Sequence, residues 1–151
     1  MKIVIIGRGN AGCISATHFA HYRNFIDTKV EIELIYDSSI PPVPTGQGTT
    51  LDFPDLLYET FNLGYLNKFP TTTKTGIMYE NFGKKNKKIF HHFPVGRYAL
   101  HFEPKQFQDF VCNNLDINFK ETDENIKKYS DIDADYIIDC RGAPKNFNKY
   151  D

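Results

Sequence analysis

The hydrophobic and polar positions at the start of the chain change from a strand pattern to a helix pattern and back. Residues 3–6 are a continuous apolar run closed by Gly7, which is typical of a strand buried on both faces. Apolar residues then recur at near-helical spacing between Ala11 and Ala20, and residues 30–36 form a second strand-like segment. A strand, a helix and a strand in direct succession predict a βαβ unit with parallel strands.

The middle of the chain begins with a stretch that predicts no regular structure. Residues 38–50 hold three prolines and two glycines, so we expect an irregular loop of a length that usually has a function. Residues 53–62 are expected to form a helix. Asp52 is its candidate N-cap, Pro54 suits its first turn and Gly64 suits its C-terminal end. Further along, the pattern predicts a hairpin made of residues 76–82 and 88–93 and a short strand at residues 98–102. A helix is expected from residue 104 onward, and a last strand at residues 136–139.

These elements predict an α/β chain with a Rossmann-like FAD/NAD(P)-binding fold, made of a parallel sheet with an added hairpin. Residues 143–151 are short and polar and hold no closing element, so we expect the fold to be incomplete. We therefore expect residues 1–151 to form one dinucleotide-binding domain at the front of a longer enzyme.

Composition and charge exclude several classes of protein. With 40% hydrophobic residues, 25% charged residues and a formal net charge of −1, the chain has no general field that would attract nucleic acid or an anionic membrane. No apolar run approaches the roughly 20 residues of a membrane span, and the first residues do not form a basic segment leading into an apolar signal region. We expect a cytoplasmic protein that binds neither nucleic acid nor membrane.

The cysteines show no spacing typical of a metal site. Cys13, Cys112 and Cys140 are far apart and form no CxxC pair, which argues against a disulfide framework and against a zinc site. We interpret all three as reduced structural thiols and predict no metal site.

The junction of the first strand and helix has the glycine spacing of a dinucleotide site. Residues 7–12 read GRGNAG, which matches the pattern GxGxxG. The first glycine allows a tight turn, the second lets the backbone approach a pyrophosphate, and the third lets the helix pack close to the strand. The helix N-terminus favours the bound anion. We assign cofactor binding to Gly7, Gly9, Asn10, Ala11 and Gly12. The alternative is a bare strand-to-helix turn.

An acidic residue closes the second strand, as a dinucleotide site requires. Asp37 occupies this position and could accept hydrogen bonds from the adenosine ribose. It lies somewhat farther from the glycine turn than is usual, so an ordinary loop acid is the alternative.

Five stretches, taken together and in this order, resemble the N-terminal part of a flavin-dependent halogenase of the tryptophan halogenase family. They are residues 3–13 (IVIIGRGNAGC), 42–50 (PVPTGQGTT), 72–82 (TTKTGIMYENF), 98–111 (YALHFEPKQFQDFV) and 134–142 (ADYIIDCRG). The second stretch is similar to the family's flavin loop, and the third to the stretch that contains its catalytic lysine. The last stretch resembles the family's strand and turn beside the cofactor.

The resemblance implies FAD as the cofactor and names further candidate residues. Lys74 falls on the family's catalytic lysine, which activates or holds hypohalous acid near an aromatic ring. A solvated surface lysine is the alternative. Arg97 could contact the cofactor or have a structural role. Cofactor contacts are also implied for Gly46, Gln47, Gly48, Thr49 and Gly142.

The chain departs from the family pattern at several points. Gln47 stands where the family has glutamate, Gly48 where it has alanine and Arg141 where it has serine. The chain contains no tryptophan, so the family's Trp-x-Trp-x-Ile-Pro signature is absent. The segment between Lys74 and His101 is shorter than in the tryptophan-specific enzymes, which leaves the substrate open.

The resemblance implies the front part of an FAD-dependent halogenase that halogenates an aromatic small molecule. Such an enzyme uses oxygen, a halide ion and reduced FAD from a separate flavin reductase, and we expect the isolated chain to be inactive. Two alternatives stay open: a stand-alone flavin- or nucleotide-binding module without catalysis, and the nucleotide-binding part of another oxidoreductase such as a flavin monooxygenase.

Overall fold

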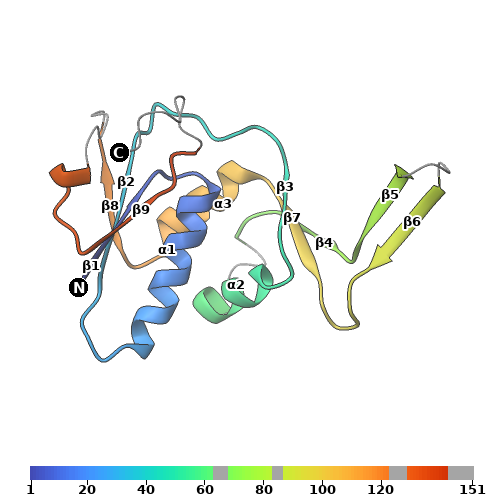
Figure 1. Ribbon diagram of the computed structural model, residues 1–151, viewed down its shortest axis with the longest axis horizontal. Coiled ribbons are helices and arrows are strands. Elements are labelled where there is room, and N and C mark those ends of the chain that lie inside the picture. The colour runs from blue at the N-terminus through green and yellow to red at the C-terminus, as the bar shows by residue number, and fades with distance from the viewer. Residues whose placement is uncertain (63–67, 83–86, 123–128, 143–151) are drawn as a thin grey trace.

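The computed structural model describes residues 1–62, 68–82, 87–122 and 129–142 of the chain (Figure 1). A parallel sheet and its helices form one end of the molecule, and a long hairpin projects from the other end. The helices are α1 (Asn10–Tyr22), α2 (Phe53–Phe61) and α3 (Pro104–Asn114). The strands are β1 (Lys2–Ile6), β2 (Glu31–Tyr36), β3 (Gln47–Gly48), β4 (Thr71–Lys74), β5 (Gly76–Phe82), β6 (Lys87–His92), β7 (Ala99–Phe102), β8 (Asn118–Glu121) and β9 (Tyr136–Asp139). Short 3-10 helices lie at Arg23–Phe25 and Tyr129–Asp131.

The parallel sheet has the strand order β8-β2-β1-β9, and every neighbouring pair in it is parallel. Strand β1 lies between β2 and β9, and its residues Val4 and Ile5 are fully buried. This position explains the continuous apolar run at residues 3–6, because a strand covered on both faces has no polar side. The βαβ unit and the Rossmann-like sheet predicted from the sequence are confirmed.

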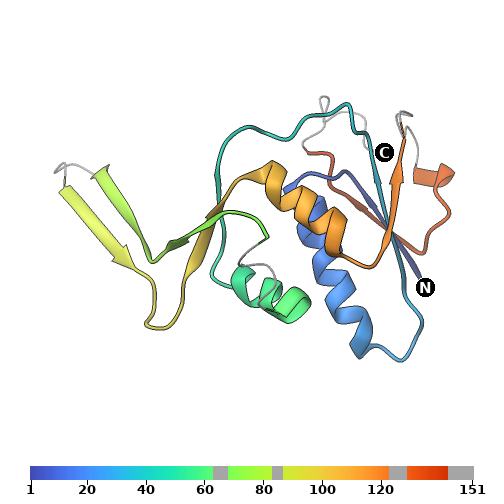
Figure 2. The same ribbon diagram turned by 180° about the vertical axis from the view of Figure 1, so that it is seen from behind.

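Most of the core lies on one face of this sheet. Ile5 of β1 and Leu34 of β2 pack there with Ala16 of α1, Leu57 of α2 and Phe107 of α3. Helix α1 contacts both α2 and α3, and Figure 2 shows α1 and α3 crossing on the same side of the sheet. Each fully buried large side chain contributes about 1.5–3 kcal/mol to folding. The glycine turn is therefore attached to a rigid core.

The opposite face of the sheet has a thinner cover. Val4, Ile6 and Ile35 are buried there against partly buried residues near the end of the described chain. These residues are Ile132, Ala134 and Ile137. Among the described elements, no α-helix covers this face.

Helix α2 occupies nearly the predicted residues and has the predicted N-cap residue, but without a capping bond from its side chain. Asp52 precedes the first helical residue, yet its carboxylate accepts no hydrogen bond from the helix. It instead accepts one from Arg97 at 2.6 Å. Asp52 is therefore the N-cap residue, as predicted, and its carbonyl accepts from the Leu56 N–H at 3.1 Å, but its side chain does not cap the helix. The Gly64 proposed for the helix end lies outside the described residues. Helix α3 begins at Pro104 as predicted, and the carboxylate of Glu103 caps it.

A second sheet is antiparallel and has the strand order β3-β7-β4. Residues 38–50 were expected to be irregular throughout, but they contain β3, which pairs with Phe102 and His101 of β7. Thr49 extends this attachment, since its N–H donates to the Leu100 carbonyl and its hydroxyl accepts from the Leu100 N–H, both at 2.8 Å. The short strands β4 and β8 were not predicted either, because each pairs with a strand far away in the sequence.

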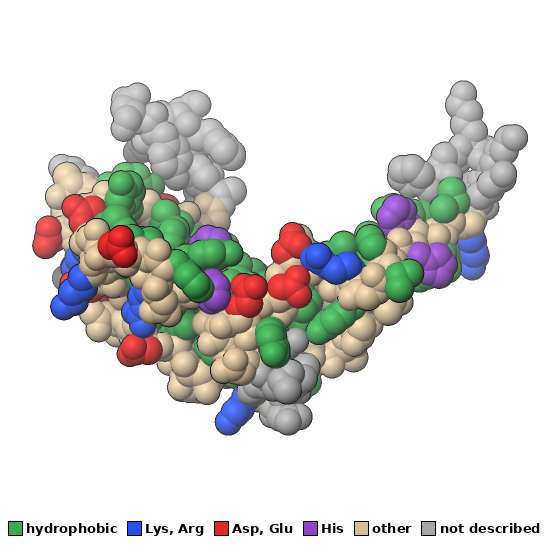
Figure 3. Space-filling view, turned by 90° about the horizontal axis from the view of Figure 1, so that it is seen from below, with side chains coloured by type: hydrophobic (Ala, Val, Ile, Leu, Met, Phe, Trp, Pro, Cys, Tyr) green, Lys and Arg blue, Asp and Glu red, His purple; other side chains and the backbone are tan. Residues whose placement is uncertain are grey.

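The predicted hairpin is confirmed as β5 and β6, which pair with each other and with no other described strand. It extends away from both sheets as an arm (Figures 1 and 3). Met78, Ile89 and Phe90 along the arm are exposed. The predicted turn at residues 83–87 lies almost entirely outside the described residues.

Candidate functional site

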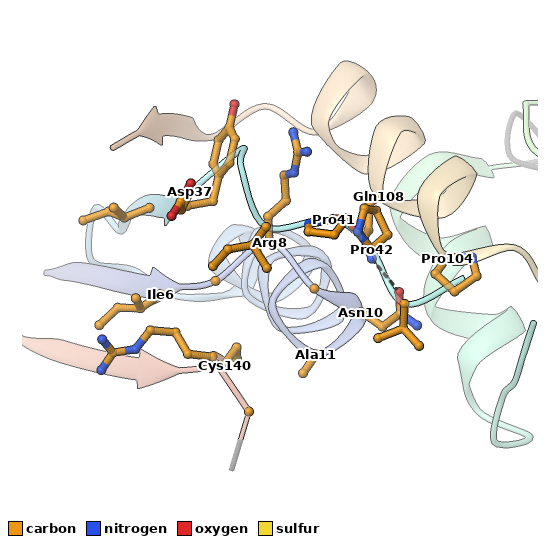
Figure 4. Close-up of a pocket in the computed structure, with 18 of the residues that line it drawn as sticks. Ile6, Arg8, Asn10, Ala11, Asp37, Pro41, Pro42, Pro104, Gln108 and Cys140 are labelled. Atoms are coloured by element: carbon orange, nitrogen blue, oxygen red, sulfur yellow. Dashed lines mark hydrogen bonds between the residues drawn. The ribbon is translucent and has the colours of Figure 1, made fainter. Parts of the chain in front are cut away.

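A cavity of about 630 Å³ lies at the carboxyl ends of β1, β2 and β9 (Figure 4). We call it the glycine-turn cavity. It is lined by residues 6–11, 35–37, 40–43 and 140–142 together with Gln47, Pro104, Gln108 and Thr122. Ligands of open α/β sheets bind at this edge, and sites for small molecules have volumes of roughly 300–1,000 Å³. The cavity therefore has the position and the size of a ligand site.

The three glycines of the turn have different reasons to be glycine. Gly7 has φ +101°, and a Cβ there would lie 3.0 Å from the carbonyl oxygen of Cys140. A Cβ on Gly12 would lie 1.8 Å from the carbonyl oxygen of Gly7, so α1 can approach the turn only without it. A Cβ on Gly9 would meet no atom of the described residues within 4 Å, and the φ of −63° at Gly9 suits any residue. The protein itself explains Gly7 and Gly12, whereas the open space at Gly9 belongs to the cavity.

Helix α1 presents free donors to this space. Gly9 is its N-cap and no side chain caps it, and no acidic residue lies in its first turn. The first N–H groups of an α-helix have no partner within the helix, and the helix dipole adds partial positive charge there. The end of α1 that lines the cavity can therefore bind an anion such as a diphosphate.

Asp37 lines the cavity at the end of β2. Its Oδ1 accepts hydrogen bonds from the Ser39 hydroxyl at 2.6 Å and from the Ser39 N–H at 2.8 Å. These bonds hold the pKa of the Asp37 carboxyl below its usual range. The carboxylate is ionised at neutral pH, so it can accept hydrogen bonds from sugar hydroxyls.

Arg8 also lines the cavity, and its guanidinium carbon lies 4.4 Å from the centre of the Tyr36 ring. The other three arginines pair with carboxylates: Arg23 with Asp116, Arg97 with Asp52 and Arg141 with Asp139. Within the described parts of the chain, no carboxylate forms an ion pair with Arg8. Its positive charge is available to a bound anion.

The cavity wall also contains a hydrogen-bonded pair of amides. Gln108 of α3 is buried, and its Nε2 donates to Oδ1 of Asn10 at 3.0 Å (Figure 4). Both residues line the cavity. The pair connects α3 with the first residue of α1, at the place where the helix N–H groups are free.

A second cavity, of about 560 Å³, lies beside the antiparallel sheet. We call it the lysine hollow; it is lined by residues 49–52, Lys74, Ile77, Phe93, Pro94 and Arg97. The Lys74 ammonium lies 5.7 Å from the centre of the Phe93 ring, within reach of a cation–π contact. A Cβ on Gly48 would lie 3.4 Å from that ammonium, so the missing side chain leaves room for it.

Comparison with known proteins gives the family. The family model described as tryptophan halogenase matches residues 2–130, which is most of the chain. The chain belongs to the tryptophan halogenase family. No curated protein sequence matches it.

Solved structures of halogenases share the fold. A tryptophan halogenase from Shewanella frigidimarina NCIMB 400 superposes with a TM-score of 0.74 at 16% identity, over 95% of this chain and 43% of that one. A tryptophan 6-halogenase from Streptomyces toxytricini gives 0.70 at 17% identity, over 93% and 42%. A flavin-dependent halogenase from Xanthomonas campestris gives 0.65 at 16% identity, over 80% and 34%. The chain thus spans less than half the length of these structures.

The structure divides the candidate residues of this halogenase-family chain between the two cavities. Gly7, Gly9, Asn10, Ala11, Asp37, Gln47 and Gly142 line the glycine-turn cavity. Thr49, Lys74 and Arg97 line the lysine hollow. Gly12, Gly46 and Gly48 line neither. The stretch that resembles the flavin loop, residues 42–50, reaches both cavities, because Gln47 lines the first and Thr49 lines the second.

Arg97 is occupied by the N-terminal end of α2. Its guanidinium donates to the Asp52 carboxylate at 2.6 Å and to the Leu51 carbonyl at 3.1 Å, and Asp55 lies at 3.5 Å. These contacts give Arg97 a structural role at the start of α2, which is one of the two roles that the sequence left open. A contact between Arg97 and the cofactor stays a prediction.

Arg8 and Gln108 are residues of the glycine-turn cavity that were not predicted from the sequence. Arg8 lies inside the glycine pattern, so its charge was visible, but its contact with Tyr36 depends on how β2 pairs with β1. Gln108 gave no signal, since only the packing of α3 on α1 brings it to Asn10.

The three cysteines are free, as expected, and Cys13 is buried. Its neighbour Cys112 and its burial raise the pKa of the Cys13 thiol, which is therefore protonated at neutral pH. Within the described ranges, no group of three or more possible metal ligands occurs. None of the helices described here is long and apolar enough to cross a membrane.

Proposed function

We propose that this chain is the FAD-binding portion of a flavin-dependent halogenase that acts on an aromatic small molecule. The observation that supports it best is the open space at Gly9 in the glycine-turn cavity, because no contact with the described residues accounts for a glycine there. Membership of the tryptophan halogenase family makes FAD the expected occupant.

The residues of the glycine-turn cavity fit FAD. The free N–H groups of α1 suit its diphosphate, the space at Gly9 admits that group close to the backbone, and Arg8 offsets its charge. Asp37 suits the ribose hydroxyls. When bound in its reduced form, FAD supplies the reducing equivalents for the reaction with oxygen. The protein's part in this cavity is to bind and orient the cofactor.

The lysine hollow fits a different task. The Lys74 ammonium forms no ion pair with any carboxylate of the described residues, and it lies beside an aromatic ring. An ammonium group carries three donors and can hold a hypohalous acid by its oxygen. In this proposal, Lys74 delivers the halogen electrophile to the substrate, and a halide ion is the second substrate.

The proposed enzyme depends on components outside this chain. A separate flavin reductase supplies reduced FAD in the cytoplasm, and the aromatic substrate binds to parts of the enzyme that the chain lacks. We expect the isolated chain to bind FAD without producing a halogenated compound.

Calorimetric titration of the chain with FAD and with NAD tests the proposal. We expect FAD to bind more tightly than NAD, because the flavin-like loop adds contacts next to the turn that both cofactors share. Equal or tighter binding of NAD would contradict the halogenase assignment. It would favour a nicotinamide-dependent oxidoreductase.

A further inference from the structure

We propose that Gln108 is a positioning residue, which holds the Asn10 amide so that its N–H groups donate to the diphosphate of the dinucleotide. The inference rests on the proposed function, since it gives one more role to residues of the glycine-turn cavity. It concerns a side chain that the glycine pattern does not include.

Gln108 is an unusual residue for its position on α3. The other buried side chains of this helix are apolar: Pro104, Phe107, Phe110 and Val111. Gln108 is only 5% exposed, and a buried amide is costly unless it is hydrogen-bonded. The hydrogen bond from its Nε2 to Oδ1 of Asn10 at 3.0 Å satisfies this requirement. Gln108 is thus held against the first turn of α1.

The direction of this bond decides what Asn10 offers to a ligand. An asparagine side chain has one acceptor oxygen and one NH2 group with two donors. Gln108 occupies the oxygen, so the NH2 group of Asn10 points away from Gln108, and no other described residue accepts from it. Asn10 lines the cavity, where it is the first residue of α1. Its NH2 donors therefore add to the free backbone donors of the helix.

The reverse orientation would have the opposite effect. If Asn10 donated to residue 108, its carbonyl oxygen would take the place of the NH2 group and repel phosphate oxygens. A glutamate at position 108 imposes this reversal, because an ionised carboxylate can only accept hydrogen bonds. Burial raises the pKa of such a carboxyl, so mild acid would neutralise it and restore a donor.

Binding of FAD, ADP and adenosine to the Gln108→Glu variant tests the inference. ADP carries the diphosphate and adenosine does not. At pH 7.5 we expect about a tenfold loss of affinity for FAD and ADP, the size typical of a lost hydrogen bond to a charged group, and little change for adenosine. At about pH 5 most of this loss should be recovered. The control is Gln106→Glu, which adds the same charge at an exposed position of α3 and should leave all three affinities unchanged.

A second variant keeps the test decisive if buried charge unfolds the protein. Gln108→Leu removes the bond without adding charge, and we expect a severalfold loss for FAD and ADP only. A folded variant that keeps wild-type affinity for ADP, or that loses as much affinity for adenosine as for ADP, would overturn the inference. If the wild-type chain binds ADP in a Gln108-dependent manner but not FAD, the proposed function fails and the inference holds. If FAD binds and substitution of Gln108 has no effect, the proposed function holds and the inference fails. A wild-type chain that binds neither FAD nor ADP overturns both the proposed function and the inference.

Discussion

The glycine-turn cavity and the lysine hollow differ in how their residues are brought together. Residues 7–11 line the first as one continuous segment, fixed between β1 and α1. The second combines residues 49–52 with Lys74, Phe93 and Arg97, which the antiparallel sheet and the start of the arm bring together. A site made by one local motif can be recognised from spacing, whereas a site assembled from distant strands has no local signature.

The two sites also differ in charge. The glycine-turn cavity combines the positive end of α1 with Arg8, which has no carboxylate partner among the described residues. In the lysine hollow, Arg97 pairs with the carboxylates of Asp52 and Asp55, whereas Lys74 forms no ion pair with a carboxylate of the described residues. This contrast suits cofactor binding in the first site and a single reactive contact in the second.

The largest expected effect comes from closing the open space of the first site. Gly9→Val should lower FAD affinity by about a hundredfold or more, because a branched side chain occupies the position that the diphosphate needs. The melting temperature should stay close to that of the wild type, since the added Cβ meets no atom of the residues that the structure describes within 4 Å. Calorimetry and thermal unfolding measure the two quantities. Retained affinity in the folded variant would mean that the turn has only a structural role.

Gly12→Ala should reverse this pattern and damage the fold rather than the cofactor contact. The added Cβ would lie 1.8 Å from a backbone oxygen, so α1 must move away from β1. We expect a loss of about 3 kcal/mol in the free energy of unfolding, measured by urea denaturation. A loss below about 0.5 kcal/mol would show that α1 can shift freely, and would contradict the close packing of α1 against the glycine turn.

Removing the charge of Arg8 should have an intermediate effect on FAD affinity, which is a property of the glycine-turn cavity alone. Arg8→Gln is expected to lower FAD affinity about tenfold and to make binding less sensitive to salt, because one charged contact with the diphosphate is lost. Arg23→Gln is the matched control, since Arg23 pairs with Asp116 and lines neither cavity. FAD titrations at low and high salt measure both quantities. If Arg8→Gln and Arg23→Gln changed FAD affinity and its salt dependence equally, the contact between Arg8 and the diphosphate would be contradicted.

The smallest expected effect concerns Asp139, which neutralises Arg141 at the edge of the glycine-turn cavity. The pKa of Asp139 is lowered to about 2, below its ordinary value of 3.8. The main cause is the pairing with Arg141, and a hydrogen bond from the Tyr129 hydroxyl adds to it. The folded state thus favours the ionised form, so the pair stabilises the protein above about pH 4 and its contribution is lost as the pH falls through about 2. Because the pair is partly exposed, we expect Asp139→Asn to cost at most about 1 kcal/mol at pH 7. The urea midpoint of the variant should lie below that of wild type at pH 7, and the difference should shrink as the pH is lowered through about 2.

Local patterns predicted the parts of the fold that local sequence determines. The unit made of β1, α1 and β2 was predicted because its apolar run, glycine turn and helical spacing are contiguous. Strand β4 was missed because the sequence TTTK has no apolar alternation, and only its pairing with β7 makes it a strand. Asp52 is the N-cap residue of α2 as predicted, but its carboxylate makes no capping bond and binds Arg97, which is distant in the sequence. Candidate site residues followed the same rule: the glycines were found by spacing, and Lys74 only through the family resemblance.

We propose that cofactor binding and halogen delivery belong to different cavities. The most direct test compares Gly9→Val with Lys74→Ala, measuring FAD affinity in this chain and product formation in the complete enzyme by mass spectrometry. Product assays contain reduced FAD, oxygen, a halide and a panel of aromatic compounds. We expect Gly9→Val to abolish both FAD binding and product, whereas Lys74→Ala should keep FAD affinity within about twofold of wild type and abolish product only. A Lys74→Ala enzyme with wild-type product yield, or with FAD affinity as low as that of Gly9→Val, would contradict this proposal.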